Sequence, residues 1–232
     1  MTLLIPLLIT LLIIITITST LLLSNRETFC SSSEWSMYNI QETTESNYRI
    51  LISAQCKPYQ DWQSASAYHS IKKVWPEANV TRILACDNPE SYKYTEIMPS
   101  FITKDYTFYD KEEYLPFNRP GSLIEYFAYD DPEEEYLIIM DPDMILLKKI
   151  DLKPTIGNAI GQFYDHMNYG QAPGKPNTGQ GLKKIAKKLL PSKIASKAQP
   201  VGAPIIICKQ DLQKIAPLWL YYTHLIRTDP EC

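Results

Sequence analysis

A strand–helix–strand succession restricts the possible folds of this chain more than any other feature of its sequence. Residues 48–56 form an apolar run that ends in small and polar residues, as a buried strand does, and residues 80–86 form a second such run. Between them, apolar residues recur at helical spacing from Trp62 to Trp75, and Pro76 ends the predicted helix. Two strands joined in this way by a helix and short links are expected to be parallel, with a right-handed crossover.

The same alternation of strands and helices continues through the rest of the chain. Nearly continuous apolar runs are typical of strands buried on both faces, so the pattern predicts an α/β fold with a mostly parallel sheet and helices on both faces. Trp62 is expected in the core of this fold. The further predicted elements are a helix with Pro120 in its first turn, strands at 135–143 and 159–165, a lysine-rich amphipathic helix at 181–197, a strand at 203–209 and a helix at 210–227 interrupted by Pro217.

The first segment of the chain differs in composition from the rest. Residues 3–23 carry no charge and consist mainly of Leu, Ile and Thr. A helix of about 20 such residues is long enough to cross the hydrocarbon core of a membrane. A cleaved signal peptide is the alternative, although its apolar core usually has about 7–15 residues. We expect a transmembrane signal anchor at 1–23, a polar stem at 24–47 and a folded domain at 48–232 in the secretory lumen.

Charge and cysteine content narrow the functional classes. The net charge of −3 over 232 residues lacks the basic surplus of a nucleic-acid-binding protein. There are five cysteines but no Cys-x-x-Cys pair, so the sequence does not indicate a zinc site or thioredoxin-like chemistry. In an oxidising lumen one or two disulfides are expected, and the sequence leaves their pairing open.

Two aspartates one residue apart interrupt the most strand-like run of the chain. Asp141 and Asp143 stand between the sequences LIIM and MILL, and parallel sheets bind ligands outside the carboxyl ends of their strands. A buried carboxylate needs a metal ion or a basic partner, and two carboxylates can hold a hard divalent cation with positions left open. Such a cation can neutralise the charge that builds on a diphosphate leaving group, as in a glycosyltransferase that uses a nucleotide sugar. A calcium-binding module, which would bind the cation without a nucleotide, is an alternative.

Five blocks of this sequence occur in the order found in one known family. They read ILISAQCKPYQDWQSASAYHSIKK, TRIL, FNRPGSLIEYF, EYLIIMDPDMI and PVGAPIIICKQDLQKIAPLW, the last followed by RTDPE. Through them the chain resembles the hydroxyproline O-arabinosyltransferases of plants and algae and the related peptidyl-serine α-galactosyltransferases. The resemblance covers residues 48–231. Because family members continue beyond this point, we expect the chain to be a fragment or a reduced form.

The resemblance implies a GT-A-like, Rossmann-like domain that uses a UDP-sugar donor and a protein acceptor and retains the anomeric configuration. It implies that Asp141 and Asp143 hold the cation, Mn²⁺ or Mg²⁺, and act in catalysis. No residue is assigned as a further metal ligand, for which His166 and His224 are candidates.

The resemblance also assigns residues to the donor side of the site. Arg119 is expected to pair with a phosphate. Asp165 is expected to act in catalysis as a contact to the donor sugar, with a role as a turn residue as the alternative. The residues expected at the nucleotide and donor are Ser53, Ala54, Gln55, Asn118 and Arg119.

The expected function is transfer of a sugar, with L-arabinofuranose as the first choice, from a UDP-sugar to hydroxyproline of secretory or cell-wall proteins. Residues 118–120 and 200–207 favour this branch, whereas Met144, where the arabinosyltransferases usually have His, and residues 164–166 favour the galactosyltransferases. The alternatives are a peptidyl-serine α-galactosyltransferase and a non-catalytic glycosyltransferase-like binding protein. The expected location is the Golgi or ER membrane, as a single-pass type II protein with a lumenal catalytic domain.

Overall fold

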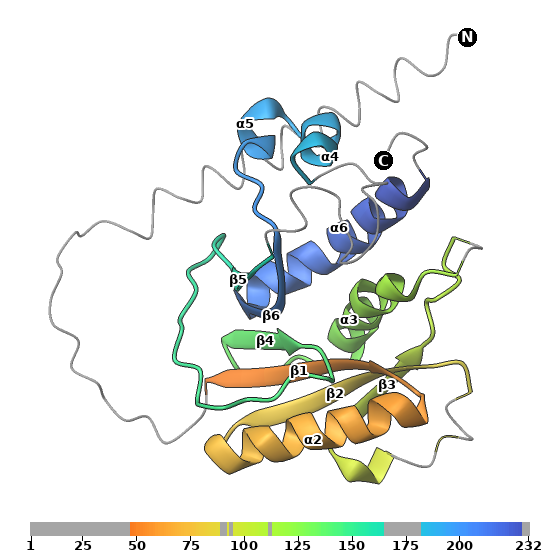
Figure 1. Ribbon diagram of the computed structural model, residues 1–232, viewed down its shortest axis with the longest axis vertical. Coiled ribbons are helices and arrows are strands. Elements are labelled where there is room, and N and C mark those ends of the chain that lie inside the picture. The colour runs from red at the N-terminus through yellow and green to blue at the C-terminus, as the bar shows by residue number, and fades with distance from the viewer. Residues whose placement is uncertain (1–46, 89–91, 93–94, 111–112, 165–181, 229–232) are drawn as a thin grey trace, which may run out of the picture. The chain divides into compact units, whose positions relative to one another are not determined.

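The computed structural model describes residues 47–88, 92, 95–110, 113–164 and 182–228, which are coloured in Figure 1. All of them fall within one unit of the chain, residues 43–232. The predicted anchor at 1–23, and the predicted stem except for its last residue, lie outside the described residues. Among the helices that the structure describes, none combines the length and the apolar composition needed to cross a bilayer.

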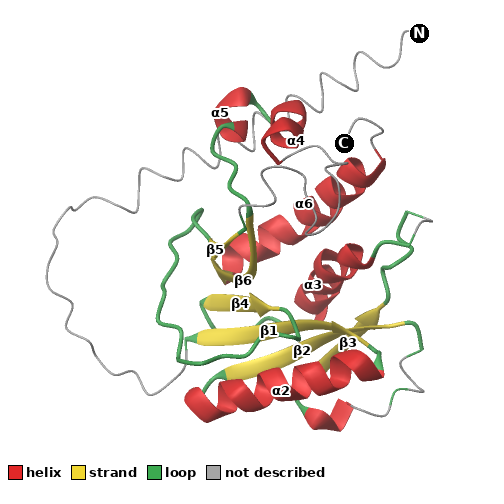
Figure 2. Ribbon diagram, viewed as in Figure 1, coloured by secondary structure: helices red, strands yellow, loops and turns green. Residues whose placement is uncertain are grey.

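A six-stranded sheet runs through the described part of the chain (Figures 1 and 2). Its strands are β1 (Tyr48–Gln55), β2 (Asn79–Cys86), β3 (Ser100–Lys104), β4 (Tyr136–Met140), β5 (Ile160–Phe163) and β6 (Val201–Cys208). They lie in the order β3-β2-β1-β4-β6-β5. The first four strands of this order are parallel, and β6 is antiparallel to both of its neighbours. The predicted mostly parallel α/β sheet is therefore confirmed.

Helices cover both faces of the sheet, as predicted (Figure 2). Helix α2 (Pro58–Val74) packs on one face, and α3 (Asn118–Tyr129) and α6 (Lys209–Thr228) pack on the other. Alternate residues of β1 serve the two layers, because Ile50 packs on the α2 side and Leu51 on the side of α3 and α6. Burying each such side chain stabilises the fold by roughly 1.5–3 kcal/mol. The shorter helices are η2 (Thr95–Ile97), η3 (Leu115–Phe117), α4 (Leu182–Leu189) and α5 (Ser192–Ala195).

Two strands have features that the sequence did not predict. The edge strand β3 was not predicted, because five residues of mixed polarity carry too little periodicity, and its pairing with β2 places it in the sheet. The predicted strand at 203–209 is confirmed as β6, but it runs opposite to β4, with Ile139 beside Ile205. As a result the first residues of β6 lie at the edge of the sheet where β4 ends.

Three helical predictions are corrected by the structure. The lysine-rich segment forms two helices, α4 and α5, because Pro191 between them has no backbone N–H and disfavours helix at the residue before it. Helix α6 continues through Pro217 without interruption. Trp62 is 60% exposed and not in the core, because the buried face of α2 is formed instead by residues that include Ala67 and Ile71.

A disulfide between Cys56 and Cys86 joins the carboxyl ends of β1 and β2. This agrees with the expected one or two disulfides and supplies the pairing that the sequence left open. In the chain-entropy model, a bond that closes a loop with a sequence separation of 30 stabilises a fold by about 3–4 kcal/mol. Cys208 is buried and free, and the other two cysteines lie outside the described residues.

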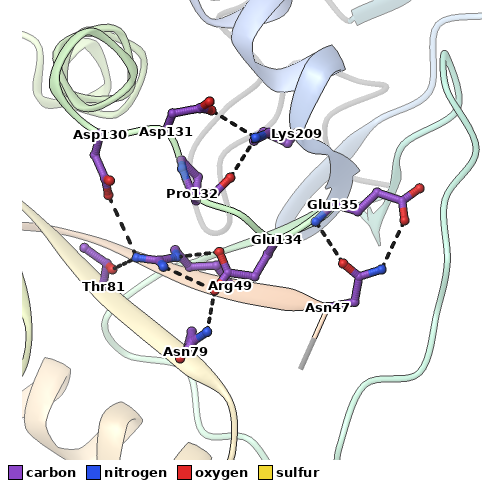
Figure 3. Close-up of polar contacts among 10 residues, drawn as sticks. All are labelled: Asn47, Arg49, Asn79, Thr81, Asp130, Asp131, Pro132, Glu134, Glu135 and Lys209. Carbon is purple, nitrogen blue, oxygen red and sulfur yellow. Dashed lines mark hydrogen bonds and ion pairs between the residues drawn. The ribbon is translucent and has the colours of Figure 1, made fainter. Parts of the chain in front are cut away.

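A polar network links the amino-terminal ends of the central strands, at the edge opposite to Asp141 (Figure 3). Buried Glu134, just before β4, accepts hydrogen bonds from Arg49 Nε at 3.0 Å and Arg49 Nη2 at 3.2 Å. Asn79, at the start of β2, donates its side-chain amide to the same carboxylate. Arg49 Nη1 also donates to Thr81 Oγ1 at 3.3 Å. The network therefore holds three neighbouring strands in one register.

Replacing Glu134 by glutamine is expected to lower the free energy of unfolding at pH 7 by about 1–3 kcal/mol, because Arg49 loses its charged partner. Burial raises the pKa of the Glu134 carboxyl, but hydrogen bonds from Arg49, a backbone N–H and Asn79 together bring this pKa below its ordinary value. A lowered folded-state pKa gives stability that is fully present above the unfolded value of about 4.3 and is lost as pH falls through the folded value. Urea unfolding between pH 7 and pH 3 should show a smaller acid-dependent loss in Glu134→Gln than in the wild type.

Glu135→Gln is the matched control for this experiment. The Glu135 side chain is exposed and accepts a hydrogen bond from the neutral Asn47 amide at 3.0 Å. Its replacement is expected to change stability by less than about 0.5 kcal/mol. Equal acid dependence in the wild type and in Glu134→Gln would contradict the assigned role of the buried carboxylate.

Candidate functional site

The aspartate pair lies at the carboxyl edge of the sheet, as its position in the sequence predicted. Asp141 follows the last residue of β4, and the turn that it opens is closed by a 3.3 Å backbone hydrogen bond to the Asp141 carbonyl. Ile52 of β1 pairs with Met140 of β4, so Ser53 lies at the level of Asp141, and β1 continues beyond β4 as far as Gln55. Asp141 is partly buried and Asp143 is exposed. Two carboxylates therefore stand where β4 ends, at the carboxyl edge of the two central parallel strands.

Arg119 supplies the basic partner that a half-buried carboxylate needs. Its guanidinium forms an ion pair with Asp141, from the second position of α3. The Arg119 side chain is 25% exposed and that of Asp141 33% exposed, and Arg119 Nε is buried without a hydrogen-bond partner among the described residues. Burial lowers the pKa of Arg119, while Asp143 and Tyr164 oppose this shift. The positive charge of Arg119 is thus stabilised by the carboxylates of both Asp141 and Asp143.

Buried hydrogen bonds fix the backbone that carries Arg119. The Tyr106 backbone N–H donates to Asn118 Oδ1 at 2.5 Å, and Asn118 Nδ2 donates to Thr107 Oγ1 at 3.0 Å. Gln55 Nε2 donates to the same threonine oxygen at 3.2 Å. The structure therefore brings the predicted residues Gln55 and Asn118 together through Thr107, which sequence reasoning missed. Their amides hold the end of β1 and the start of α3 in place.

Gly121 lets the first turn of α3 rest directly on an aromatic ring. A Cβ at this position would lie 2.4 Å from Tyr106 Cγ, so no larger residue fits without displacing the ring. The Tyr106 hydroxyl donates to Glu125 Oε1 at 2.7 Å, one turn further along the helix. The glycine of the Asn-Arg-Pro-Gly sequence is therefore part of the packing that brings Arg119 to Asp141.

The β5–β6 pair adds a further residue to this edge. The Tyr164 hydroxyl donates to the Ala203 carbonyl at 2.9 Å, and the Tyr164 backbone N–H donates to the Pro200 carbonyl at 2.7 Å. Its ring lies against Gly202, where a Cβ would be 2.7 Å from Tyr164 Cε2. The sequence indicated Tyr164 only as a branch marker, because its partner Ala203 lies far along the chain, in a strand whose direction the sequence left open. Asp165, the predicted sugar contact, lies outside the described residues.

The end of β1 presents a smaller polar surface than the sequence predicted. Ala54 is buried and packs with Leu84 and Cys86, so its methyl group does not line the site. Gln55 is buried in the network with Thr107. Among the predicted residues of β1, Ser53 is therefore the one with a partly exposed polar side chain.

Asp141 and Asp143 are the side chains at this edge that could bind a divalent cation. Across the described segments, no group of three or more His, Cys, Asp or Glu side chains is arranged to hold a metal ion. His224 Nδ1 lies 3.8 Å from Asp110 Oδ2, and its ring packs edge-on against Tyr109, while His166 lies outside the described residues. A cation here would use oxygens of Asp141 and Asp143 and complete its coordination with ligand or water oxygens, as hard cations do.

An acidic pair and an arginine stand here at the carboxyl edge of an α/β sheet, which is the edge where such sheets bind ligands, and an arginine is a group that can pair with a phosphate. Comparison with known proteins gives the family. Residues 48–232 match the model of the hydroxyproline O-arabinosyltransferase family N-terminal domain, and the chain belongs to this family.

Two relatives show how much of a family member the chain represents. It is 26% identical over 196 residues to hydroxyproline O-arabinosyltransferase 1 of Arabidopsis thaliana, covering 79% of this chain and 50% of the relative. It is 27% identical over 188 residues to peptidyl serine alpha-galactosyltransferase of the same plant, covering 78% of this chain and 22% of the relative. The chain thus spans about half the length of the first relative and less than a quarter of the second.

Among solved structures, the chain is similar to the galactosyltransferase LgtC crystallised with donor and acceptor sugar analogs. The TM-score is 0.48 at 8% sequence identity, over 79% of this chain and 67% of that structure.

Proposed function

We propose that this domain belongs to a GT-A-type glycosyltransferase that moves a sugar, most simply L-arabinofuranose, from a UDP-sugar to hydroxyproline of a secretory protein, with retention. One observation carries the proposal. The Asp141 and Asp143 carboxylates stand at the carboxyl edge of β4 beside Arg119, in a chain of the hydroxyproline O-arabinosyltransferase family.

In this proposal the residues of the chain bind and orient the diphosphate of the donor. A Mn²⁺ or Mg²⁺ ion held by Asp141 and Asp143 would neutralise the charge that develops on the diphosphate as the bond to the sugar breaks. Arg119 pairs with a phosphate oxygen, for which its planar guanidinium is well suited. Ser53 offers a hydroxyl to the nucleotide from the end of β1. Tyr164 holds the start of β6 at the same edge.

Asp165 and the segments before the folded domain are assigned roles on their sequence alone. Asp165 follows Tyr164 in the chain and is proposed to contact the donor sugar. Residues 1–23 are proposed to anchor the protein in the Golgi or ER membrane, and residues 24–47 to connect the anchor to the lumenal domain. The uncharged apolar run at 3–23 supports the anchor.

Galactosyl transfer to serine is a second candidate. It is favoured by the similarity to a peptidyl serine alpha-galactosyltransferase, whose 27% identity matches the 26% found for an arabinosyltransferase. Met144, directly after the aspartate pair, favours the same branch. The two candidates share the donor diphosphate and the metal, and they differ in the sugar and in the acceptor side chain.

A donor screen tests the proposed function. The full chain, purified in detergent, is incubated with UDP-L-arabinofuranose or UDP-galactose and with hydroxyproline or serine peptides, and products are followed by mass spectrometry. We expect transfer of arabinose to hydroxyproline, loss of transfer with a chelator, and recovery with Mn²⁺. Galactose on the serine peptide would select the second candidate, and UDP binding without transfer of either sugar would reject catalysis. The anomeric configuration of the product, read by NMR, tests retention.

A further inference from the structure

We infer that Arg119 is the internal counter-ion of Asp141 in the ligand-free protein, and that it exchanges this carboxylate for a phosphate when the donor binds. The consequence is that the divalent cation and the diphosphate bind this site together, and that each binds weakly alone. The inference rests on the proposed function, because it assigns a binding order to the same aspartate pair.

Competition for one carboxylate is the first step of the argument. The Arg119 guanidinium is in contact with Asp141 Oδ1, which is also an oxygen that a cation at the pair would use. A guanidinium and a divalent cation on the same carboxylate repel each other, and the repulsion is stronger in a partly buried site than in water. A cation that takes this oxygen displaces Arg119 from it, and the repulsion favours the same displacement when the cation binds through the other oxygen of Asp141.

The surroundings of Arg119 make that displacement unfavourable without a new anion. Three quarters of its side chain is buried, and Arg119 Nε already lacks a hydrogen-bond partner among the described residues. Breaking a partly buried ion pair leaves an uncompensated charge, which is strongly destabilising. Asp143, the other carboxylate that acts on this guanidinium, is itself required by the cation.

A diphosphate removes this obstacle because it brings its own negative oxygens. Guanidinium–phosphate pairs are charge-assisted and frequently bidentate, so Arg119 regains a partner when it leaves Asp141. The diphosphate also supplies oxygen ligands to the cation, which complements the two aspartates. Each ligand therefore raises the affinity for the other, and by linkage the two factors are equal.

The exchange needs a movement of one side chain and not of the helix. Asn118 is held by Tyr106 and Thr107, and Gly121 rests on the Tyr106 ring, so the backbone on both sides of Arg119 is fixed. An arginine side chain has enough rotatable bonds to move between neighbouring anions on such a base. The switch is therefore local to the carboxyl edge.

Titration of Mn²⁺ alone tests the exchange without any sugar transfer. Free Mn²⁺ is followed by electron paramagnetic resonance with the full chain in detergent, first without nucleotide and then with saturating UDP. In the wild type we expect UDP to lower the Mn²⁺ Kd by about tenfold or more. In Arg119→Gln we expect Mn²⁺ alone to bind about 5- to 10-fold more tightly than in the wild type, and UDP to lower its Kd by a smaller factor than in the wild type, because only the direct ligation of the cation by the diphosphate remains.

Two further variants separate the exchange from a general change of charge. Lys149→Gln removes one positive charge from the loop after the aspartate pair, where Lys149 pairs with Glu77 at 2.8 Å, and is expected to change the Mn²⁺ Kd by less than about twofold. Arg119→Lys keeps the charge but loses the bidentate geometry, so it should keep the weak binding of Mn²⁺ alone and show a smaller effect of UDP.

The outcomes that overturn the inference differ from those that overturn the proposed function. Unchanged or weaker binding of Mn²⁺ alone in Arg119→Gln, or the same tightening in Lys149→Gln, refutes the exchange even if the protein transfers sugar. Tighter Mn²⁺ binding with reduced coupling in Arg119→Gln supports the exchange even if the donor screen detects no transfer. Mn²⁺ binding that Asp143→Asn does not weaken refutes both the exchange and the metal site.

Discussion

Replacing Asp143 by asparagine is expected to reduce transfer from the UDP-sugar by about a thousandfold or more, a loss of about 4 kcal/mol of transition-state stabilisation. The amide keeps the size of the side chain but removes the negative charge that would hold the cation. Asp143 is exposed at the end of β4, so the substitution should leave the fold intact. The measurement is kcat/KM for the donor at fixed acceptor and saturating Mn²⁺, with thermal unfolding to confirm an unchanged Tm.

Asp151→Asn provides the matched control. Asp151 is an exposed aspartate in the loop that follows the pair, and its substitution makes the same change of charge and volume. We expect it to alter kcat/KM by less than about twofold, because the charge of an exposed side chain is largely screened by salt. Retention of a tenth or more of the activity in Asp143→Asn would show that this carboxylate does not hold an essential cation.

Replacing Asp61 by alanine is expected to have the largest effect on stability, about 3–5 kcal/mol. The Arg82 side chain is fully buried, Asp61 is 7% exposed, and Arg82 Nη1 lies 3.2 Å from Asp61 Oδ1. The Tyr92 hydroxyl contacts the same carboxylate oxygen, and Arg82 Nε donates to Ser100 Oγ at 3.1 Å. Without Asp61 the guanidinium of β2 would stay inside the fold without its carboxylate, which is the reason for the large cost.

An exposed ion pair in the same domain gives the comparison. Glu77 pairs with Lys149 at 2.8 Å with both side chains about half exposed, and Glu77→Ala should leave the free energy of unfolding nearly unchanged. The double variant Asp61→Ala/Arg82→Met should be less destabilised than the sum of the two single variants, because it removes both buried charges. Urea unfolding measures the free energies of unfolding of Asp61→Ala, Arg82→Met and the double variant. A loss below about 1 kcal/mol in Asp61→Ala would contradict a buried, energetically coupled pair.

The strands and most helices of this domain could be predicted because their signals lie in contiguous residues. The runs that became β1, β2 and β4 are continuous and apolar since both faces of the sheet are covered. The sequence offered no prediction where the deciding contact is distant in the chain. Strand β3 depends on its pairing with β2, and the direction of β6 depends on its pairing with β4. Trp62 followed the helical spacing of the core residues but lies on the outer face of α2.

The part of the candidate site that could be predicted is the part whose signal also lies in contiguous residues. The Asp-Pro-Asp turn is a local feature at the end of an apolar run, so Asp141 and Asp143 could be placed at a strand end from sequence. The contacts around them join residues far apart in the chain. Gln55 meets Thr107 across 52 positions, and Tyr164 meets the Ala203 carbonyl across 39. No periodicity or motif in the sequence indicates such pairs.

The sequence by itself determined the alternation of strands and helices, the position of the acidic pair at a strand end and the family to which the chain belongs. The tertiary structure decided that Arg119 meets Asp141, 22 positions away, and that buried amides fix the helix start from which it reaches. The physical reason is that secondary structure follows from hydrophobic periodicity and turn-forming residues over short stretches. Which charged side chains share a buried edge depends instead on how the strands pair and on where the helices pack against them.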